Sequence, residues 1–255
     1  MMPAPRDEFY VGYLPAPPGI VLFLRYLLPP VLILTAGFAG ILAALHGNPG
    51  SGVWDTTTPQ TIAGVLSAAP YPMLRVPDAE AAAGFRTYFV VEQGKFAGGQ
   101  RAARFDGQPV HARGWLLERE GRRMIELDAG PGDLAPGGGV ASADLRSPAI
   151  EPLGTTVLCG EIVDTKCYLG AMKPGEGKTH KECATLCIAG GIPPTLVTET
   201  PAGARSYVLL TSVTGGPLDA RILPFVADPV EIAGELVRCG DVLMLRIDPA
   251  SIRRF

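Results

Sequence analysis

One stretch of this chain occurs twice, and this repeat constrains the fold more than any other feature. Segment 105–128 aligns without gaps with segment 225–248. The identical pairs are Phe105/Phe225, Pro109/Pro229, Val110/Val230, Gly114/Gly234, Leu116/Leu236, Met124/Met244 and Asp128/Asp248. Further upstream, Tyr88–Val91 resembles Tyr207–Leu210. Two copies of one module are the simplest explanation.

Each copy has the pattern of a small all-β unit. Short apolar runs of strand length follow one another, joined by tight turns at Glu120-Gly121 and at Cys239-Gly240. The predicted strands are 64–66, 86–91, 110–117 and 124–127 in the first copy, and 155–163, 195–197, 206–210, 230–237 and 242–247 in the second. About five strands per copy predict OB-like barrels, one over 57–128 and one over 153–255. The predicted fold is therefore mainly β.

Two segments differ from this pattern. Residues 129–152 are rich in Gly and Pro, and we expect them to form a linker without core packing. The second copy has an insertion between its first strand and the strand at Thr195–Val197. We expect a helix at Thr179–Ile188 within the insertion, capped by Gly190-Gly191. A gained insertion that carries three cysteines is the predicted site of function.

Near the N-terminus the chain is almost entirely apolar from Gly19 to Leu45. About 20 apolar residues cross the hydrocarbon core of a bilayer, and we predict a transmembrane anchor at 26–46, with Pro29-Pro30 in its first turn. Arg6 and Arg25 precede this segment and the next basic residue is Arg75, so the positive-inside rule predicts a cytoplasmic segment 1–25.

The predicted topology is thus a single pass through the cytoplasmic (inner) membrane, with the modules in the periplasm or outside the cell. Two alternatives remain open. One is a cleaved signal peptide, with a small-x-small site such as 37–39, and the other is the core helix of a soluble protein.

Composition excludes several classes of partner. The net charge is −3 and Lys and Arg do not cluster, which argues against nucleic acid. Gly177-Lys178-Thr179 resembles the end of a phosphate-binding loop, but Met172 stands where that loop needs glycine, so we expect no nucleotide. The motifs of serine hydrolases and zinc proteases are missing, and the sequence favours a non-enzymatic role.

The strongest chemical signal is the cluster Cys167, His180, Cys183 and Cys187. On a helix, His180, Cys183 and Cys187 share one face, and Cys167 would close the site. A Cys3His set suits tetrahedral zinc, and its soft thiolates, with Met172 near, also suit Cu(I). We therefore predict a metal site for zinc or copper at these four residues.

Other interpretations of the same residues remain open. One is a disulfide from Cys167 to Cys183 or Cys187, and the other is a redox-active pair of thiols. Asp164 and Glu161 are candidate acceptors for the second nitrogen of His180, or else solvated carboxylates at a strand edge.

Cys159 and Cys239 lie on strands expected to be adjacent and antiparallel. We predict a disulfide between them at one end of the second barrel, with two free thiols as the alternative.

The pattern Asp164-x-Lys166-Cys167…His180-x-x-Cys183-Ala184-x-x-Cys187 resembles that of small exported bacterial proteins. The resemblance covers 155–248. It implies an OB-like barrel with a Cys/His site and transfers no activity.

We therefore expect a membrane-anchored periplasmic accessory protein, or a subunit of a membrane protein complex, with a Cys/His metal or redox site that supports metal handling or electron transfer. The alternatives are an interaction module stapled by disulfides and a thiol oxidoreductase using Cys183 or Cys187.

Overall fold

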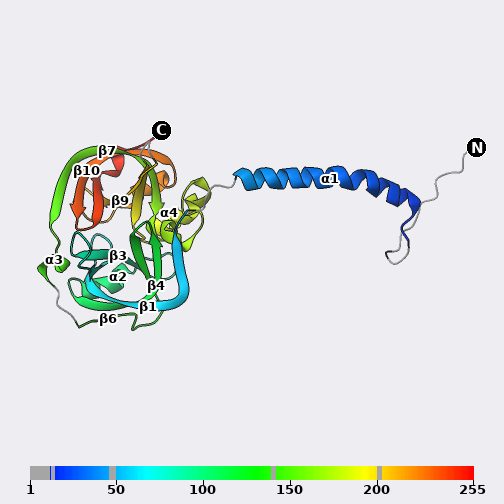
Figure 1. The fold of residues 1–255 in the computed structure, drawn as a ribbon. Coiled ribbons are helices and arrows are strands. Elements are labelled where there is room, and N and C mark those ends of the chain that lie inside the picture. Colours follow the sequence, from blue (N-terminus) through cyan, green and yellow to red (C-terminus); the bar gives the residue numbers. More distant parts are fainter. Residues whose placement is uncertain (1–11, 13–14, 46–49, 139–141, 200–202) are drawn as a thin grey trace, which may run out of the picture. The chain divides into compact units, whose positions relative to one another are not determined.

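The structure is a computed structural model that describes residues 12, 15–45, 50–138, 142–199 and 203–255 (Figure 1). The chain divides into two compact units, 1–48 and 49–255. Each unit is described by itself.

In the described residues of the first unit there is one helix, α1 (Pro18–Leu45), of 28 residues. By length and composition this helix is apolar enough to cross a membrane, and a signal sequence near an N-terminus has the same properties. The helix begins at Pro18, where a proline at the first helical position is favourable. Pro29 and Pro30 therefore lie inside the helix, which corrects their predicted place in the first turn.

The second unit begins with a closed barrel. Its strands are β1 (Val53–Ser67), β2 (Met73–Pro77), β3 (Phe85–Val91), β4 (Pro109–Arg119), β5 (Arg122–Leu127) and β6 (Leu134–Pro136). The pairing order β1-β2-β3-β5-β4 returns from β4 to β1, and only β3 and β5 are parallel among these neighbours. A short helical segment, α2 (Gly99–Ala102) with η1 (Ala103–Phe105), connects β3 to β4.

A second barrel repeats this arrangement (Figure 1). Its strands are β7 (Ile150–Asp164), β8 (Pro194–Glu199), β9 (Arg205–Ser212), β10 (Pro229–Cys239), β11 (Val242–Ile247) and β12 (Ile252–Arg254). The order β7-β8-β9-β11-β10 also returns to its first strand, and β9 and β11 are its parallel pair. Its short 3-10 helices are η4 (Ala220–Phe225) and η5 (Pro249–Ser251). The two OB-like barrels predicted from the sequence are therefore present.

The strand register shows that the barrels are equivalent residue by residue. Gly64 pairs with Val110 in the first barrel, and Gly160 pairs with Val230 in the second. A Cβ on Gly64 would lie 2.5 Å from the Arg75 carbonyl oxygen, and one on Gly160 would lie 2.2 Å from that of Val197. Since no side chain fits there, glycine lets the first strand of each barrel approach the second closely.

The equivalence corrects one detail of the repeat. Phe89 pairs with Met124 and Leu209 pairs with Met244, so Phe89 corresponds to Leu209. Tyr88 then corresponds to Val208 rather than to Tyr207. The alignment based on residue identity, which placed Tyr88 opposite Tyr207, was therefore shifted by one residue. A shift of one residue moves every side chain to the other face of the strand.

The predicted linker contains ordered structure. β6 pairs with β4 just as β12 pairs with β10, and so the first module has a sixth strand within 129–152. The helix α3 (Ala143–Arg146) follows, and Leu134 and Leu145 are both buried. The expectation that this stretch packs nothing is wrong at these two residues. Its Gly and Pro content concealed the strand, because proline is tolerated at a sheet edge.

The two barrels pack against each other through equivalent outer surfaces. One apolar cluster contains both members of the pairs Phe89/Leu209, Leu117/Val237 and Met124/Met244. Separate clusters fill the interior of each barrel. The cluster between the barrels also contains Cys167, Leu169, Cys187 and Ile192 from the insertion. The insertion is therefore packed between the two modules.

Candidate metal centre

The insertion fills residues 165–193, where the first barrel has only the short connection 68–72. It consists of a π-helical turn, η2 (Cys167–Ala171), a 3-10 turn, η3 (Lys178–His180), and the helix α4 (Lys181–Ala189). Gly191 follows α4 with a φ of 92°, and the Ile192 N–H reaches back to the Cys187 carbonyl. This confirms the predicted helix and its glycine cap.

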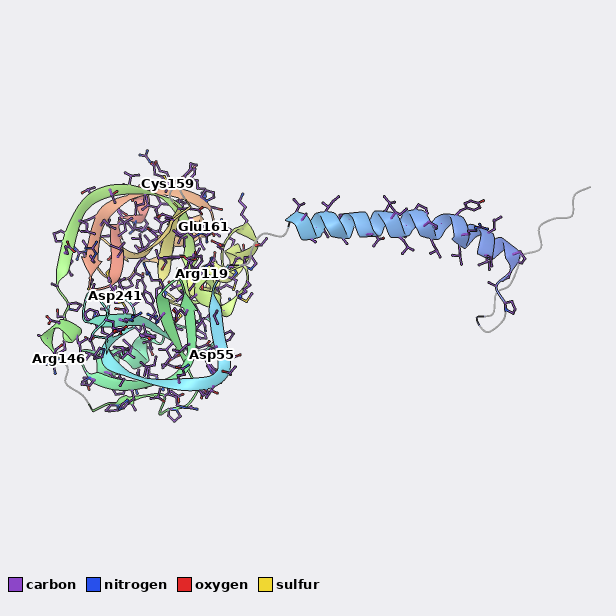
Figure 2. The ribbon with its side chains drawn as sticks, viewed as in Figure 1. Asp55, Arg119, Arg146, Cys159, Glu161 and Asp241 are labelled. Atoms are coloured by element: carbon purple, nitrogen blue, oxygen red, sulfur yellow. The ribbon has the colours of Figure 1, made fainter. Side chains whose placement is uncertain are left out.

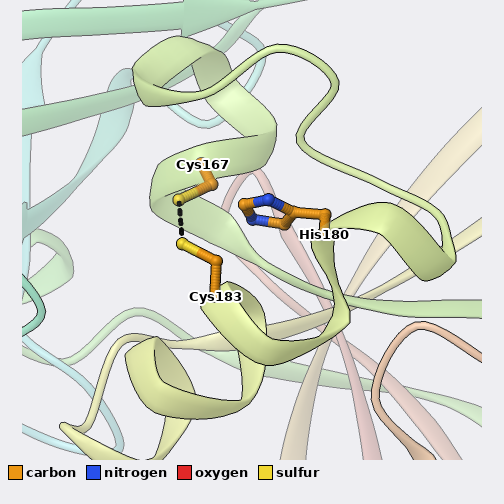
Figure 3. A group of neighbouring side chains, drawn as sticks. All are labelled: Cys167, His180 and Cys183. Carbon is orange, nitrogen blue, oxygen red and sulfur yellow. Dashed lines mark hydrogen bonds between the residues drawn. The ribbon is translucent and has the colours of Figure 1, made fainter.

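Three predicted ligands converge in this insertion (Figure 3). One donor atom each from Cys167, His180 and Cys183 lie within 4.8 Å of one another. The two sulfur atoms are 4.0 Å apart. A disulfide requires about 2.05 Å, whereas two thiolates bound to one tetrahedral zinc ion at about 2.3 Å are separated by about 3.8 Å. The spacing therefore fits two ligands of one metal ion.

A buried carboxylate orients the imidazole. His180 Nε2 lies 3.1 Å from Asp164 Oδ2, and the two side chains are 4% and 0% exposed. The other carboxylate oxygen of Asp164 accepts the N–H of Cys167 at 2.8 Å. Asp164 thus has the acceptor role proposed for it and is not a solvated carboxylate. A carboxylate in this position fixes the orientation of a metal-binding imidazole.

Glu161 has a different role from the one considered for it. Its carboxylate accepts the N–H of Gly177 at 2.5 Å and so fixes the loop that leads to His180. Burial raises the pKa of Glu161 above its usual value.

Cys187, the fourth predicted ligand, also lies close to Cys167. It forms a separate group with Cys167 and Asp164, again with donor atoms within 4.8 Å of one another. A hydrogen bond with the Cys167 thiol lowers the pKa of Cys187, and the charge of Lys95 lowers it further. The same hydrogen bond, together with burial, raises the pKa of Cys167. All four predicted residues therefore belong to one continuous cluster, in which Cys167 is shared.

Lys95 of the first barrel enters this cluster, although no pattern in the sequence links it to the cysteines. The ammonium group lies 2.9 Å from Cys183 Sγ and 3.5 Å from Cys187 Sγ. Its hydrogen bond with Cys183 raises the pKa of Lys95. Lys95 lies far from the cysteines in the sequence, and only the packing of the two barrels brings them together.

A glycine places the loop of Lys95 against α4. A Cβ on Gly190 would lie 1.8 Å from the carbonyl oxygen of Lys95, and the Ala97 N–H donates to the Gly190 carbonyl at 3.2 Å. The first barrel therefore covers one side of the cluster.

The predicted disulfide between Cys159 and Cys239 is wrong. All five cysteines are free. Cys159 pairs with Glu231 and Cys239 with Ile150, which separates the two cysteines by roughly 25 Å along the strands. Figure 2 shows Cys159 and Asp241, which follows Cys239 closely, at opposite ends of the second barrel. The first strand begins at Ile150 rather than at 155, so that Cys159 lies well past its start.

Met172, considered as a copper ligand, is 48% exposed. Comparisons with protein-family models, with curated proteins and with solved structures gave no match.

Proposed function

We propose that this protein is a membrane-anchored accessory protein whose second barrel binds a zinc ion through Cys167, His180 and Cys183, with Cys187 as the fourth ligand. The observation that carries the proposal is the convergence of two thiols and an imidazole that is held by a buried carboxylate. A metal-binding histidine commonly donates its second N–H to such an acceptor.

Several features favour zinc over Cu(I). A mixed imidazole and thiolate set is typical of zinc, and a buried site closed by protein ligands is typical of structural zinc. Three thiolates and a neutral imidazole give Zn²⁺ a net charge of −1, which the Lys95 ammonium beside two of the sulfur atoms would balance. The only thioether near the cluster in sequence, that of Met172, belongs to a side chain that is 48% exposed.

We also propose that α1 anchors the protein in a membrane. The length and hydropathy of α1 support a span, and the basic residues on its N-terminal side support a periplasmic or extracellular location for both barrels. In that location a closed metal site keeps the cysteines from random oxidation and holds the two barrels in one arrangement. This role suits a subunit of a membrane complex.

Metal analysis of the full chain purified in detergent tests the site. We expect about one zinc per chain and loss of the metal in Cys183→Ser and in His180→Ala. Cys159→Ser is the matched control, because Cys159 is an exposed cysteine outside the cluster, and it should retain the metal. A metal-free protein with all five thiols reactive after unfolding would contradict the proposal.

A thiol oxidoreductase is the second candidate, and one observation favours it. Cys183 is partly exposed, as a reactive thiol must be, and its sulfur accepts a hydrogen bond from Lys95. Reduction of a disulfide substrate by the full chain, abolished in Cys183→Ser and unchanged in Cys159→Ser, would establish this function and exclude a permanently bound zinc ion.

A further inference from the structure

A second site lies between the two barrels, beside the metal centre but distinct from it. It is a cavity of about 300 Å³, a size that suits a small organic ligand. Tyr168 and Leu169, which directly follow Cys167, form part of its wall, and the rest comes from the facing strands of the two barrels.

The cavity is built from equivalent positions of the two modules that have diverged in chemistry. Phe89 and Leu209 occur at equivalent positions, and both line it. Arg122 and Arg123 of the first barrel are equivalent to Val242 and Leu243 of the second, and all four residues line the cavity. One wall is therefore cationic and the opposite wall is apolar.

Of the arginines that the first barrel contributes to the lining, Arg122 is available for a ligand. Arg86 pairs with Asp78, and Arg123 pairs with Glu118 at 3.3 Å. Within the described part of the chain, Arg122 has no carboxylate partner, and its guanidinium lies 5.3 Å above the ring of Tyr207. The single carboxylate of the lining is that of Asp241, from the second barrel. It accepts hydrogen bonds from the N–H and the hydroxyl of Thr87, at 2.9 and 2.5 Å.

From this geometry we infer that the cavity binds a small amphiphilic anion, with a carboxylate at Arg122 and an apolar body against Val242, Leu243 and Leu209. A guanidinium recognises a carboxylate through two parallel hydrogen bonds, and the apolar wall supplies burial for the remainder of the ligand. The ring of Tyr207 holds the Arg122 guanidinium beside the cavity.

The test is ligand-detected NMR with the full chain in phosphatidylcholine nanodiscs, and empty nanodiscs as the blank. The probes are 4-phenylbutyrate and its neutral amide, which share the apolar body and differ in charge. Three variants are compared with the unsubstituted chain. Arg122→Gln removes the cation, Val242→Trp fills the apolar side, and Arg253→Gln removes an exposed arginine of β12 that does not line the cavity.

We expect saturable binding of the acid at millimolar concentration or below and binding of the amide about tenfold weaker or more, because a charge-assisted hydrogen bond is lost. Arg122→Gln should weaken the acid to the level of the amide, Val242→Trp should abolish both, and Arg253→Gln should change neither. Equal binding of acid and amide, binding that survives Arg122→Gln and Val242→Trp, or no saturable binding of either probe would each overturn the inference. Zinc content, measured in the same samples, reports on the metal site separately.

Discussion

The ammonium group of Lys166 in the second module lies 2.9 Å from the carboxylate of Glu126 in the first, and the two side chains are only 4% and 5% exposed. Lys166 also donates to the carbonyl oxygens of Glu92 and Gly94, at 3.0 and 2.7 Å. The residue that directly precedes Cys167 is therefore fixed to the first barrel by three hydrogen bonds. The position of the Cys/His cluster therefore depends on the contact between the barrels.

Removing one partner of this buried pair should destabilise the protein strongly. We expect Lys166→Met to lower the free energy of unfolding by about 3–5 kcal/mol, because Glu126 is left as an uncompensated buried charge. Urea unfolding followed by tryptophan fluorescence measures the change. The double variant Lys166→Met with Glu126→Leu should recover much of the loss, since it removes both charges. A single variant as stable as the unsubstituted chain would mean that the pair is not buried.

Gly190 controls how closely the loop of Lys95 approaches α4. In Gly190→Ala the new methyl group meets the Lys95 carbonyl oxygen, so the loop must move away, at a cost of about 1–3 kcal/mol. We expect lower stability together with weaker metal retention. Gly99→Ala is the control, since a Cβ there meets nothing within 4 Å. If Gly190→Ala matches Gly99→Ala in both measurements, the close approach does not exist in solution.

Lys95 should tune the metal affinity without being a ligand. In Lys95→Met the hydrogen bonds to Cys183 and Cys187 are lost, and we expect zinc to bind about 10–100-fold more weakly, as for other groups that contact metal ligands. Competition with a chromogenic chelator measures the affinity. Lys178→Met, an exposed lysine of the same insertion, should bind zinc as tightly as the unsubstituted chain. If Lys95→Met also bound zinc as tightly as the unsubstituted chain, Lys95 would not contribute to the metal affinity.

Tyr71 should make the contact between the barrels sensitive to alkaline pH. Its hydroxyl donates to the Leu210 carbonyl and accepts the Leu218 N–H, and burial raises the pKa of Tyr71 to about 12. Because the folded-state pKa lies above the unfolded value of about 10, the stabilisation is complete below pH 10 and is lost as the pH rises towards 12.

Over this pH range the ionisation of Tyr71 lowers the free energy of unfolding by about 2–3 kcal/mol. Unfolding by urea at pH 9 and pH 11.5 should therefore show a smaller loss of stability in Tyr71→Phe than in the unsubstituted chain. Tyr88→Phe, at a partly exposed tyrosine, is the control. An identical pH dependence in Tyr71→Phe would contradict the burial of this hydroxyl.

Local patterns in the sequence were sufficient for most of the β strands, though not for β2, β6 and β12, and for the helix α4 and its glycine cap. Alternating apolar residues and tight turns report local conformation, and the i, i+3 and i+7 spacing of His180, Cys183 and Cys187 reports a shared helix face. The predicted disulfide failed because strand register is a long-range property. Once β7 is known to begin at Ile150, Cys159 cannot reach Cys239.

The sequence by itself determined that two similar barrels would form and that the cysteines of one insertion would gather near a histidine, because these properties follow from residues close together in the chain. Only the tertiary structure decided that the barrels pack through equivalent faces, that Lys95 and Glu126 of the first barrel complete the environment of the cluster, and that a cavity with one cationic and one apolar wall lies between them. These contacts join residues far apart in the sequence. Their geometry is set by how two closed barrels fit together, which no local pattern records.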